Sequence, residues 1–237
     1  HIQGGIGNQL FQIFATMEYA FKHNISFYLP NFKGMLGLDF KSYRSSYWNT
    51  LFKNLKPYIR DEKLMNIKIN YNEKENYIYS TIPYYTDCNT RLIGYFQNVQ
   101  YFSEYSDKII EKIGIRNLQK EIQNKYDFTN TISLHFRIGD YKFSKLHLII
   151  GIQYYIDALQ KIISLTNKDS YIIKYCHEEQ DTTIVNGHIN TLRKQFPSLI
   201  FQRVDNTLHD WQQMLYMSLC EHNICLLYTS PSPRDDP

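Results

Sequence analysis

The segment "SLHFRIGDY", residues 133–141, marks the point where an apolar strand pattern gives way to charged residues. Residues 131–136 are predicted to form a buried parallel strand. His135, Arg137 and the turn at Gly139 then lie at its carboxyl end, the edge where open α/β sheets bind ligands. Arg137 offers a planar fork that suits a diphosphate. An alternative stays open, in which Arg137 and Asp140 form a structural ion pair that closes a loop and His135 is merely packed.

The sequence around this segment alternates between strand and helix patterns, which favours parallel α/β construction. Before it, helices are predicted at 10–21 and 101–113 and strands at 25–29 and 92–96, with an irregular stretch at 31–90. Beyond it, strands at 131–136, 170–175 and 199–203 alternate with helices at about 152–164, 181–195 and 208–222. We therefore expect two α/β domains facing a cleft, an N-terminal domain over 1–126 and a C-terminal domain over 127–224.

The glycine-rich segment "GGIGNQ", residues 4–9, precedes the first predicted helix. Such a turn can present backbone N–H groups to an anion. It is neither a dinucleotide fingerprint, because Leu10 replaces the third glycine, nor a phosphate-binding P-loop, because the Gly-Lys-Ser/Thr ending is missing. A purely geometric role for Gly5 and Gly7 is equally compatible with the pattern. Asn8 and Gln9 add side-chain amides that suit a sugar or a phosphate.

Composition excludes several classes of protein. The formal charge of +3 on 237 residues is too small to indicate nucleic-acid binding. No apolar run reaches the length of a membrane-spanning helix. The four cysteines are too dispersed to predict a disulfide framework or a zinc site, and the histidines show no ligand spacing. We expect no metal, no cofactor and a cytoplasmic protein, with peripheral membrane association left open.

The last residues, 225–237, differ in character from the rest of the chain. Cys225 to Asp235 match the translation of an adapter used in transposase-based sequencing libraries, so we interpret 225–237 as a non-native tail. The chain also lacks an initiator Met. The genuine part is therefore expected to be truncated at both ends, and the second domain to be incomplete.

Four segments in order resemble glycosyltransferase family 11, the α-1,2-fucosyltransferases. They are "GGIGNQLFQ" (4–12), "GYFQNVQYF" (94–102), "HFRIGDY" (135–141) and "DWQQMLYMSLCEHNI" (210–224). The resemblance implies a GT-B-like fold with two Rossmann-like domains. It further implies metal-independent, inverting transfer of L-fucose from GDP-fucose to the 2-hydroxyl of a galactose-containing glycan.

By position, the resemblance assigns roles to particular residues. Arg137 would bind the GDP diphosphate and neutralise the leaving group, while His135 and Asp140 would shape the same catalytic pocket. On the donor side, the residues implied are Gly5, Gly7, Asn8, Gln9, Arg137 and Asp210.

The sequence departs from the family pattern at three places. Ile138 replaces a frequent Arg, Gln213 replaces a frequent Asp, and the tail replaces the last donor-binding motif. The fragment is therefore expected to be inactive. Alternatives are a transferase for another GDP-sugar or linkage, and a non-catalytic protein that binds nucleotide sugars or glycans.

Overall fold

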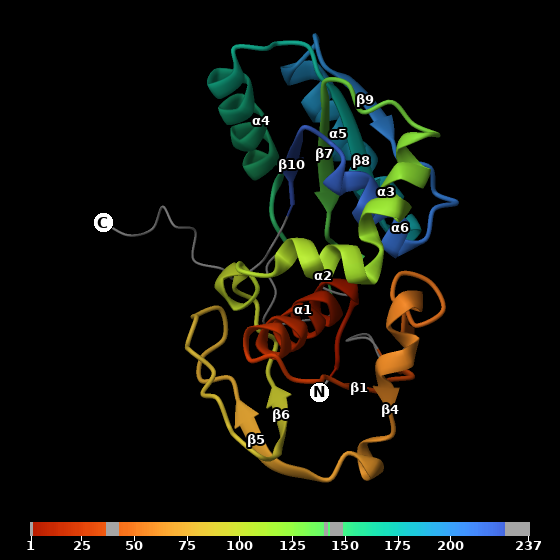
Figure 1. Ribbon diagram of the computed structural model, residues 1–237. Helices are drawn as coiled ribbons and strands as arrows, with labels where there is room; N and C mark the ends of the chain where they lie inside the picture. Colours follow the sequence, from red (N-terminus) through yellow and green to blue (C-terminus); the bar gives the residue numbers. More distant parts are fainter. Residues whose placement is uncertain (1, 37–42, 140–141, 143–148, 226–237) are drawn as a thin grey trace. The chain divides into compact units, whose positions relative to one another are not determined.

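The computed structural model describes residues 2–36, 43–139, 142 and 149–225 (Figure 1). Contacts divide the chain into two compact units, residues 1–116 and 117–237. Helix α3 (Ile115–Gln123) begins at the end of the first unit and continues into the second.

The second unit is a parallel α/β sheet covered on both faces. Its elements are β7 (Thr131–Phe136), α4 (Ile152–Thr166), β8 (Ile172–His177), η5 (Glu179–Asp181), α5 (Thr182–Gln195), β9 (Ile200–Arg203), α6 (Asp210–Ser218) and β10 (His222–Ile224). The strand order is β10-β7-β8-β9, and every pairing is parallel. The chain thus winds outward from β7 to β9 and returns through α6 to the other side of β7. The reversal lies between β7 and β10.

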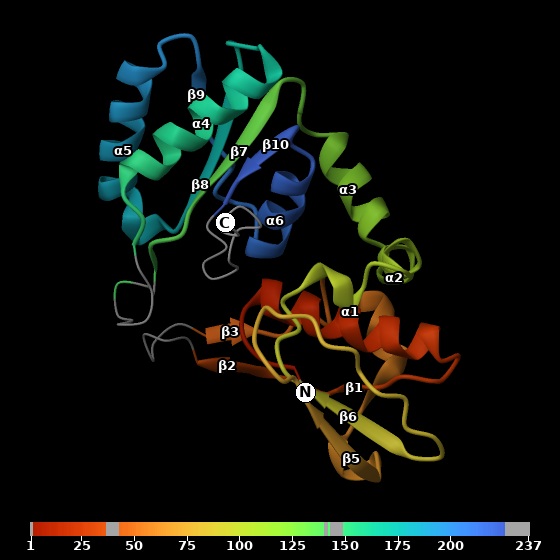
Figure 2. The same cartoon turned by 90° about the vertical axis from the view of Figure 1, so that its left-hand side faces the viewer.

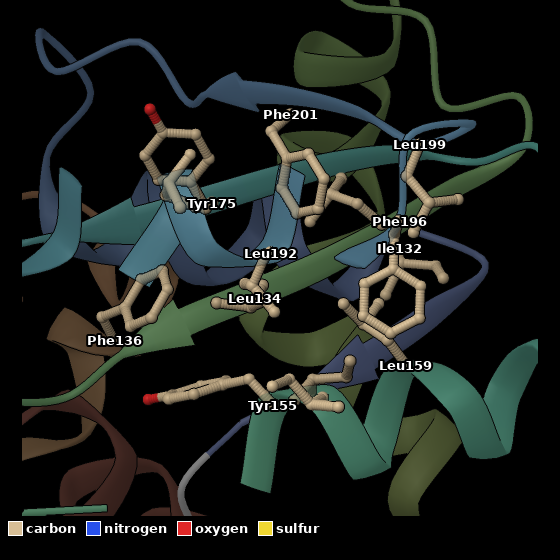
Figure 3. Packing of buried hydrophobic residues seen from close by; sticks show 14 of the residues in the cluster. Ile132, Leu134, Phe136, Tyr155, Leu159, Tyr175, Leu192, Phe196, Leu199 and Phe201 are labelled. Carbon is tan, nitrogen blue, oxygen red and sulfur yellow. The ribbon is translucent and has the colours of Figure 1, made fainter. Parts of the chain in front are cut away.

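The core of the second unit lies between the sheet and helices α4 and α5 (Figures 2 and 3). Side chains alternate along a strand, so Ile132, Leu134 and Phe136 share one face of β7, and all three are almost fully buried. Phe136 packs against Tyr155 of α4 with ring centroids 4.7 Å apart. This packing fixes which face of β7 its other residues occupy.

The opposite face of β7 carries polar side chains and is covered by α6 (Figure 2). Thr131 and Ser133 are buried there, and the Ser133 hydroxyl donates to Asn223 Oδ1 of β10 at 2.5 Å. Tyr216 of α6 is also buried, with its ring 4.7 Å from that of Phe128. His135 therefore emerges on the α6 side of the sheet.

The first unit is built around helix α1 (Ile6–Lys22). Its strands pair two by two among the described residues: β1 (Leu29–Pro30) with β4 (Ile59–Arg60), β2 (Gly34–Leu36) with β3 (Tyr43–Ser45), and β5 (Ile67–Asn72) with β6 (Asn89–Ile93). The β1–β4 and β5–β6 pairs are parallel. The remaining elements are η1 (Lys53–Tyr58), η2 (Glu62–Leu64), η3 (Val99–Tyr101) and α2 (Ser106–Ile113).

A buried carboxylate fixes α1 against the turn that precedes α2. Glu18 accepts hydrogen bonds from the N–H groups of Glu104 and Tyr105, at 3.1 and 2.9 Å. Burial raises the pKa of Glu18, and these two bonds oppose the rise. These bonds hold the carboxyl-terminal half of α1 against the segment before α2.

The predicted elements agree with the structure best in the second unit. The strand predicted at 131–136 and the helices predicted at 152–164 and 181–195 are confirmed to within a few residues. The helix predicted at 208–222 is too long, because α6 ends at Ser218 and β10 follows. The strand predicted at 25–29 is almost entirely wrong, since only Leu29 lies in β1. The stretch predicted to be irregular contains β5, whose alternation of apolar and polar residues went unrecognised.

We predict that Leu134→Ala destabilises the second unit by about 2–4 kcal/mol, because it leaves a cavity in a close-packed core. Leu165→Ala is the matched control, since Leu165 is 68% exposed and should change stability little. The chain has two tryptophans, so in a Trp48→Phe background the fluorescence of Trp211 reports urea unfolding of the second unit. Equal effects of the two alanine variants would contradict the described packing.

Candidate functional site

The carboxyl ends of β7 and β10 meet at the reversal of strand order. In open α/β sheets, ligands bind in the crevice at such a switch point. Arg137 follows directly after β7, and Cys225 follows directly after β10. Cys225 Sγ lies 3.5 Å from His135 Nδ1, so the two strand ends are in contact. This fold feature makes the Arg137 edge the candidate site of the second unit.

His135 is a neutral imidazole in this setting. Burial, and secondarily the positive charge of Arg137, lowers its pKa to about 4. Cys176 of β8 is its neighbour in register, and burial raises the pKa of that thiol to about 12. Both side chains are therefore uncharged at neutral pH. His135 can supply a hydrogen-bonding group to the site, and Arg137 supplies positive charge.

The Arg137 guanidinium forms an ion pair with Glu178, which follows β8. Arg137 Nη1 donates to Glu178 Oε1 at 2.7 Å. The arginine side chain is only 20% exposed, whereas the glutamate side chain is 49% exposed. The guanidinium is therefore mostly buried, and the Glu178 carboxylate lies nearer to solvent.

A second carboxylate, that of Asp181, holds the loop after β7. Asp181 is fully buried, and its carboxylate accepts from the Gly139 N–H at 2.7 Å and from Lys142 Nζ. A buried carboxylate is stable only when its oxygens are paired. Asp181 therefore ties the loop to the start of α5.

Two other predicted residues are placed differently. Asp140, which the sequence pairs with Arg137, lies outside the described residues. Asp210 is exposed at the first position of α6, where its carboxylate accepts from the Trp211 N–H at 2.7 Å. Gln213, which stands where the resembling family has an acid, donates through Nε2 to the Leu208 carbonyl at 2.9 Å. The Gln213 amide therefore stabilises the local turn before α6.

In the first unit, two motifs meet at the amino end of α1. Gln97 Nε2 donates to Asn8 Oδ1 at 2.7 Å, which joins "GGIGNQ" to "GYFQNVQYF". Gln9 is buried, and its Nε2 donates to the carbonyls of Gly4 and Ser45. Gln9 Oε1 is buried and has no hydrogen-bond partner among the residues that the structure describes. Asn8 is thus held beside the helix start, while Gln9 points into the unit.

Among the glycines of this turn, Gly4 is the one that the backbone requires. Its φ is +83°, and a Cβ there would lie 2.4 Å from Asn8 Nδ2. Gly5 has an extended conformation as the N-cap of α1, and the space beside Gly7 is open. The sequence singled out Gly5 and Gly7, but Gly4 is the residue that lets Asn8 approach the backbone.

The sequence analysis missed Glu178, Asp181, Gln97 and Glu73. The acidic stretch "HEEQD", residues 177–181, ends a predicted strand and therefore carried a detectable signal. No local sequence signal marks Glu73, because its hydrogen bonds are to residues 95 and 96, far along the chain. Its carboxylate accepts from the N–H groups of Tyr95 and Phe96 at 2.7 and 3.0 Å, which shapes the segment that bears Gln97.

The first unit also contains a cavity of about 640 Å³ beside β1, β5 and β6. Its lining comes from Ile2, the second half of α1, residues 25–30 and residues between 62 and 92, and includes none of residues 4–9. The cavity is therefore separate from the Asn8 site.

No group of three His, Cys, Asp or Glu residues gathers as a metal site within the described part of the chain. The same part contains no helix that is both long and apolar enough to cross a membrane.

The fold and the switch-point site define the second unit as a Rossmann-like α/β unit that carries Arg137 at the carboxyl edge of its sheet. No protein-family model matches the chain. Over 193 residues, the chain is 27% identical to an alpha-1,2-colitosyltransferase of Escherichia coli. The aligned region covers 67% of this chain and 61% of that enzyme, so the chain spans less than two-thirds of the relative's length.

We predict that Asp181→Asn destabilises the second unit by about 2–3 kcal/mol, because it leaves Lys142 and the Gly139 N–H without a charged acceptor. Asp157→Asn is the control, since Asp157 is exposed on α4 and accepts only from Gln153. Urea unfolding, followed by Trp211 fluorescence, measures the free energy of unfolding of both variants. A loss no larger than that of Asp157→Asn would show that the loop is not held by Asp181.

We also predict that His135 makes stability dependent on pH. Its folded pKa of about 4 lies below the ordinary value of 6.5, so the unfolded chain binds a proton in this window that the folded chain does not. Stability therefore falls as pH drops from about 6.5 towards 4. Between about pH 7.5 and pH 5, wild type should lose about 1–2 kcal/mol more than His135→Gln in urea unfolding. Equal losses would contradict a neutral, buried His135.

Proposed function

We propose that the protein to which this chain belongs is a glycosyltransferase that uses a GDP-linked sugar. In the form that the motifs favour, it transfers L-fucose from GDP-fucose, with inversion, to the 2-hydroxyl of a galactose-containing glycan. The second unit would bind the donor. This chain covers only part of the length of its relative, so the proposed reaction is assigned to the whole protein.

The observation that carries the proposal is the position of Arg137. Arg137 follows β7 at its carboxyl end, beside the reversal of strand order, which is the edge where this type of sheet generally binds nucleotides. Two parallel N–H groups of Arg match two oxygens of a phosphate. The α-1,2 linkage in the relative's name supports the same class of reaction.

The chemistry follows from where charge develops. When the bond between the sugar and the β-phosphate breaks, negative charge grows on the departing GDP. A positioned guanidinium lowers the barrier by stabilising that charge more in the transition state than in the ground state. His135, neutral at physiological pH, would donate or accept one hydrogen bond in the same pocket. No cofactor or metal enters this proposal.

Asn8 is the proposed contact from the first unit. Its amide is oriented by Gln97, and the glycine turn brings it against the backbone. An amide in this position offers one donor and one acceptor to a sugar hydroxyl. Gly5, Gly7 and Gln9 would support this contact through the turn, and Asp210 would lie on the nucleotide side of the second unit.

A second candidate function differs in the transferred sugar. The relative is named for colitose, which is L-fucose without the 3-hydroxyl, so the donor of this protein could be GDP-linked colitose. Displacement of bound GDP by GDP-fucose, GDP-colitose and GDP-mannose distinguishes the candidates. A site that hydrogen-bonds the 3-hydroxyl of fucose should bind the deoxy sugar more weakly, because the polar group is left unpaired.

We predict that the chain binds GDP and that Arg137→Ala weakens binding by about 10- to 100-fold, the value of a charge-assisted pair. Arg137→Lys should recover part of the affinity, because it keeps the charge and loses the fork. Isothermal titration calorimetry measures the GDP affinity of the wild-type chain, Arg137→Ala and Arg137→Lys. Arg203→Ala is the control, since Arg203 lies at the end of β9 and pairs with Glu179 at 2.6 Å.

Each outcome of this titration is informative. A selective loss in Arg137→Ala supports the donor site. Equal losses in Arg137→Ala and Arg203→Ala would indicate general attraction by positive charge. Absence of GDP binding both by the wild-type chain and by the whole protein to which it belongs would overturn the proposal and return Arg137 to a structural role in the loop.

A further inference from the structure

Glu178 is held in a defined position against Arg137. One carboxylate oxygen accepts from the guanidinium at 2.7 Å, and the other accepts from Gln180 Nε2 at 2.7 Å. The carbonyl oxygen of Glu178 lies 2.8 Å from His177 Nδ1. Both the backbone and the side chain of Glu178 are therefore fixed beside the guanidinium.

The Glu178 carboxylate occupies space that Gly139 leaves open because it has no side chain. A Cβ at Gly139 would lie 2.3 Å from Glu178 Oε1 and 2.6 Å from its carboxyl carbon. The φ of Gly139 is +26°, a conformation that L side chains rarely adopt. The Asp181 carboxylate also holds Gly139, because it accepts a hydrogen bond from the Gly139 N–H. The glycine of "HFRIGDY" therefore provides the space in which Glu178 reaches Arg137.

We propose that Glu178 is an internal counterion that an anionic ligand must displace from Arg137. This inference rests on the proposed function, because it takes the ligand to be the diphosphate of a nucleotide sugar. A mostly buried guanidinium requires anionic partners when no ligand is bound, and Glu178 is one of them. A diphosphate supplies the same partner in the occupied site, and two anions cannot share the fork without repulsion.

The difference in exposure makes this exchange feasible. Glu178 is 49% exposed and can turn into water, whereas Arg137 is 20% exposed and stays in place. Glu178 regains hydration when the pair opens, and an incoming diphosphate takes its place beside Arg137, so the exchange costs less than leaving the guanidinium without an anion. A neutral ligand would not replace the lost charge. Glu178 should therefore favour anionic ligands over neutral ones while lowering affinity for all of them.

The test is a calorimetric titration of the full chain with GDP and, separately, with inorganic pyrophosphate. Four proteins are compared: wild type, Glu178→Gln, Arg137→Ala and the double variant. Glu178→Gln should tighten GDP binding by about 3- to 10-fold, because the amide keeps the shape and removes the competing charge. The same substitution should have no effect in the Arg137→Ala background. Glu179→Gln is the matched control, since its carboxylate pairs with Arg203 and should leave GDP affinity unchanged.

The outcomes separate this inference from the proposed function. GDP binding that depends on Arg137 but is unchanged or weakened in Glu178→Gln would overturn the inference and leave the donor site in place. Tightening that persists in the Arg137→Ala background would also overturn it, because the effect would then act without Arg137. Absence of GDP binding both in every variant and in the whole protein to which the chain belongs would overturn both. Thermal unfolding of each variant by circular dichroism ensures that the folded proteins are compared.

Discussion

The pairing of β7 on both of its edges is the constraint on which the rest of the second unit depends. β8 pairs along the full length of β7 on one side, and β10 pairs on the other. A strand held on both edges cannot shift its register without turning Leu134 out of the core. The residues that follow β7 must therefore leave the sheet at one point, between two strand ends. The position of Arg137 is a consequence of backbone hydrogen bonds and apolar packing rather than of any contact that Arg137 itself makes.

Charge at this edge is balanced by acids that belong to one short segment. Glu178, Glu179 and Asp181 follow β8. They contact cations that follow β7 or lie at the end of β9. Their burial differs, and so does their function. The fully buried Asp181 fixes the backbone of the loop, whereas the half-exposed Glu178 makes a contact that can be exchanged. The same acidic segment thus contains Asp181, which holds the backbone of the loop, and Glu178, whose contact with Arg137 can be exchanged.

Much of the second unit could be predicted from the sequence, because β7 is buried on both faces and the helices have a regular apolar period. The position of Arg137 at a strand end followed from the same pattern. The order of the strands did not, since nothing local in 222–224 indicates that β10 inserts beside β7. The acids that face Arg137 were missed for a related reason, because the contact depends on which strand is adjacent. In the first unit, Asn8 was selected correctly as a residue at a helix start, but its partner Gln97 lies too far along the chain for any local pattern to reveal.

The two long-range side-chain bonds have a consequence for the order in which the chain folds during synthesis. Asn8 meets Gln97 across 89 residues, and Ser133 meets Asn223 across 90. In each unit, an element made early gains one of its partners late in synthesis. As the chain leaves the ribosome, β7 can pair with β8 and then β9, but its other edge has no partner until β10 emerges. An unpaired strand edge is a template for association with another chain. β7 lies inside the finished sheet, but in the nascent sheet one of its edges is exposed. That edge is closed only when β10, near the end of the described chain, has been synthesised.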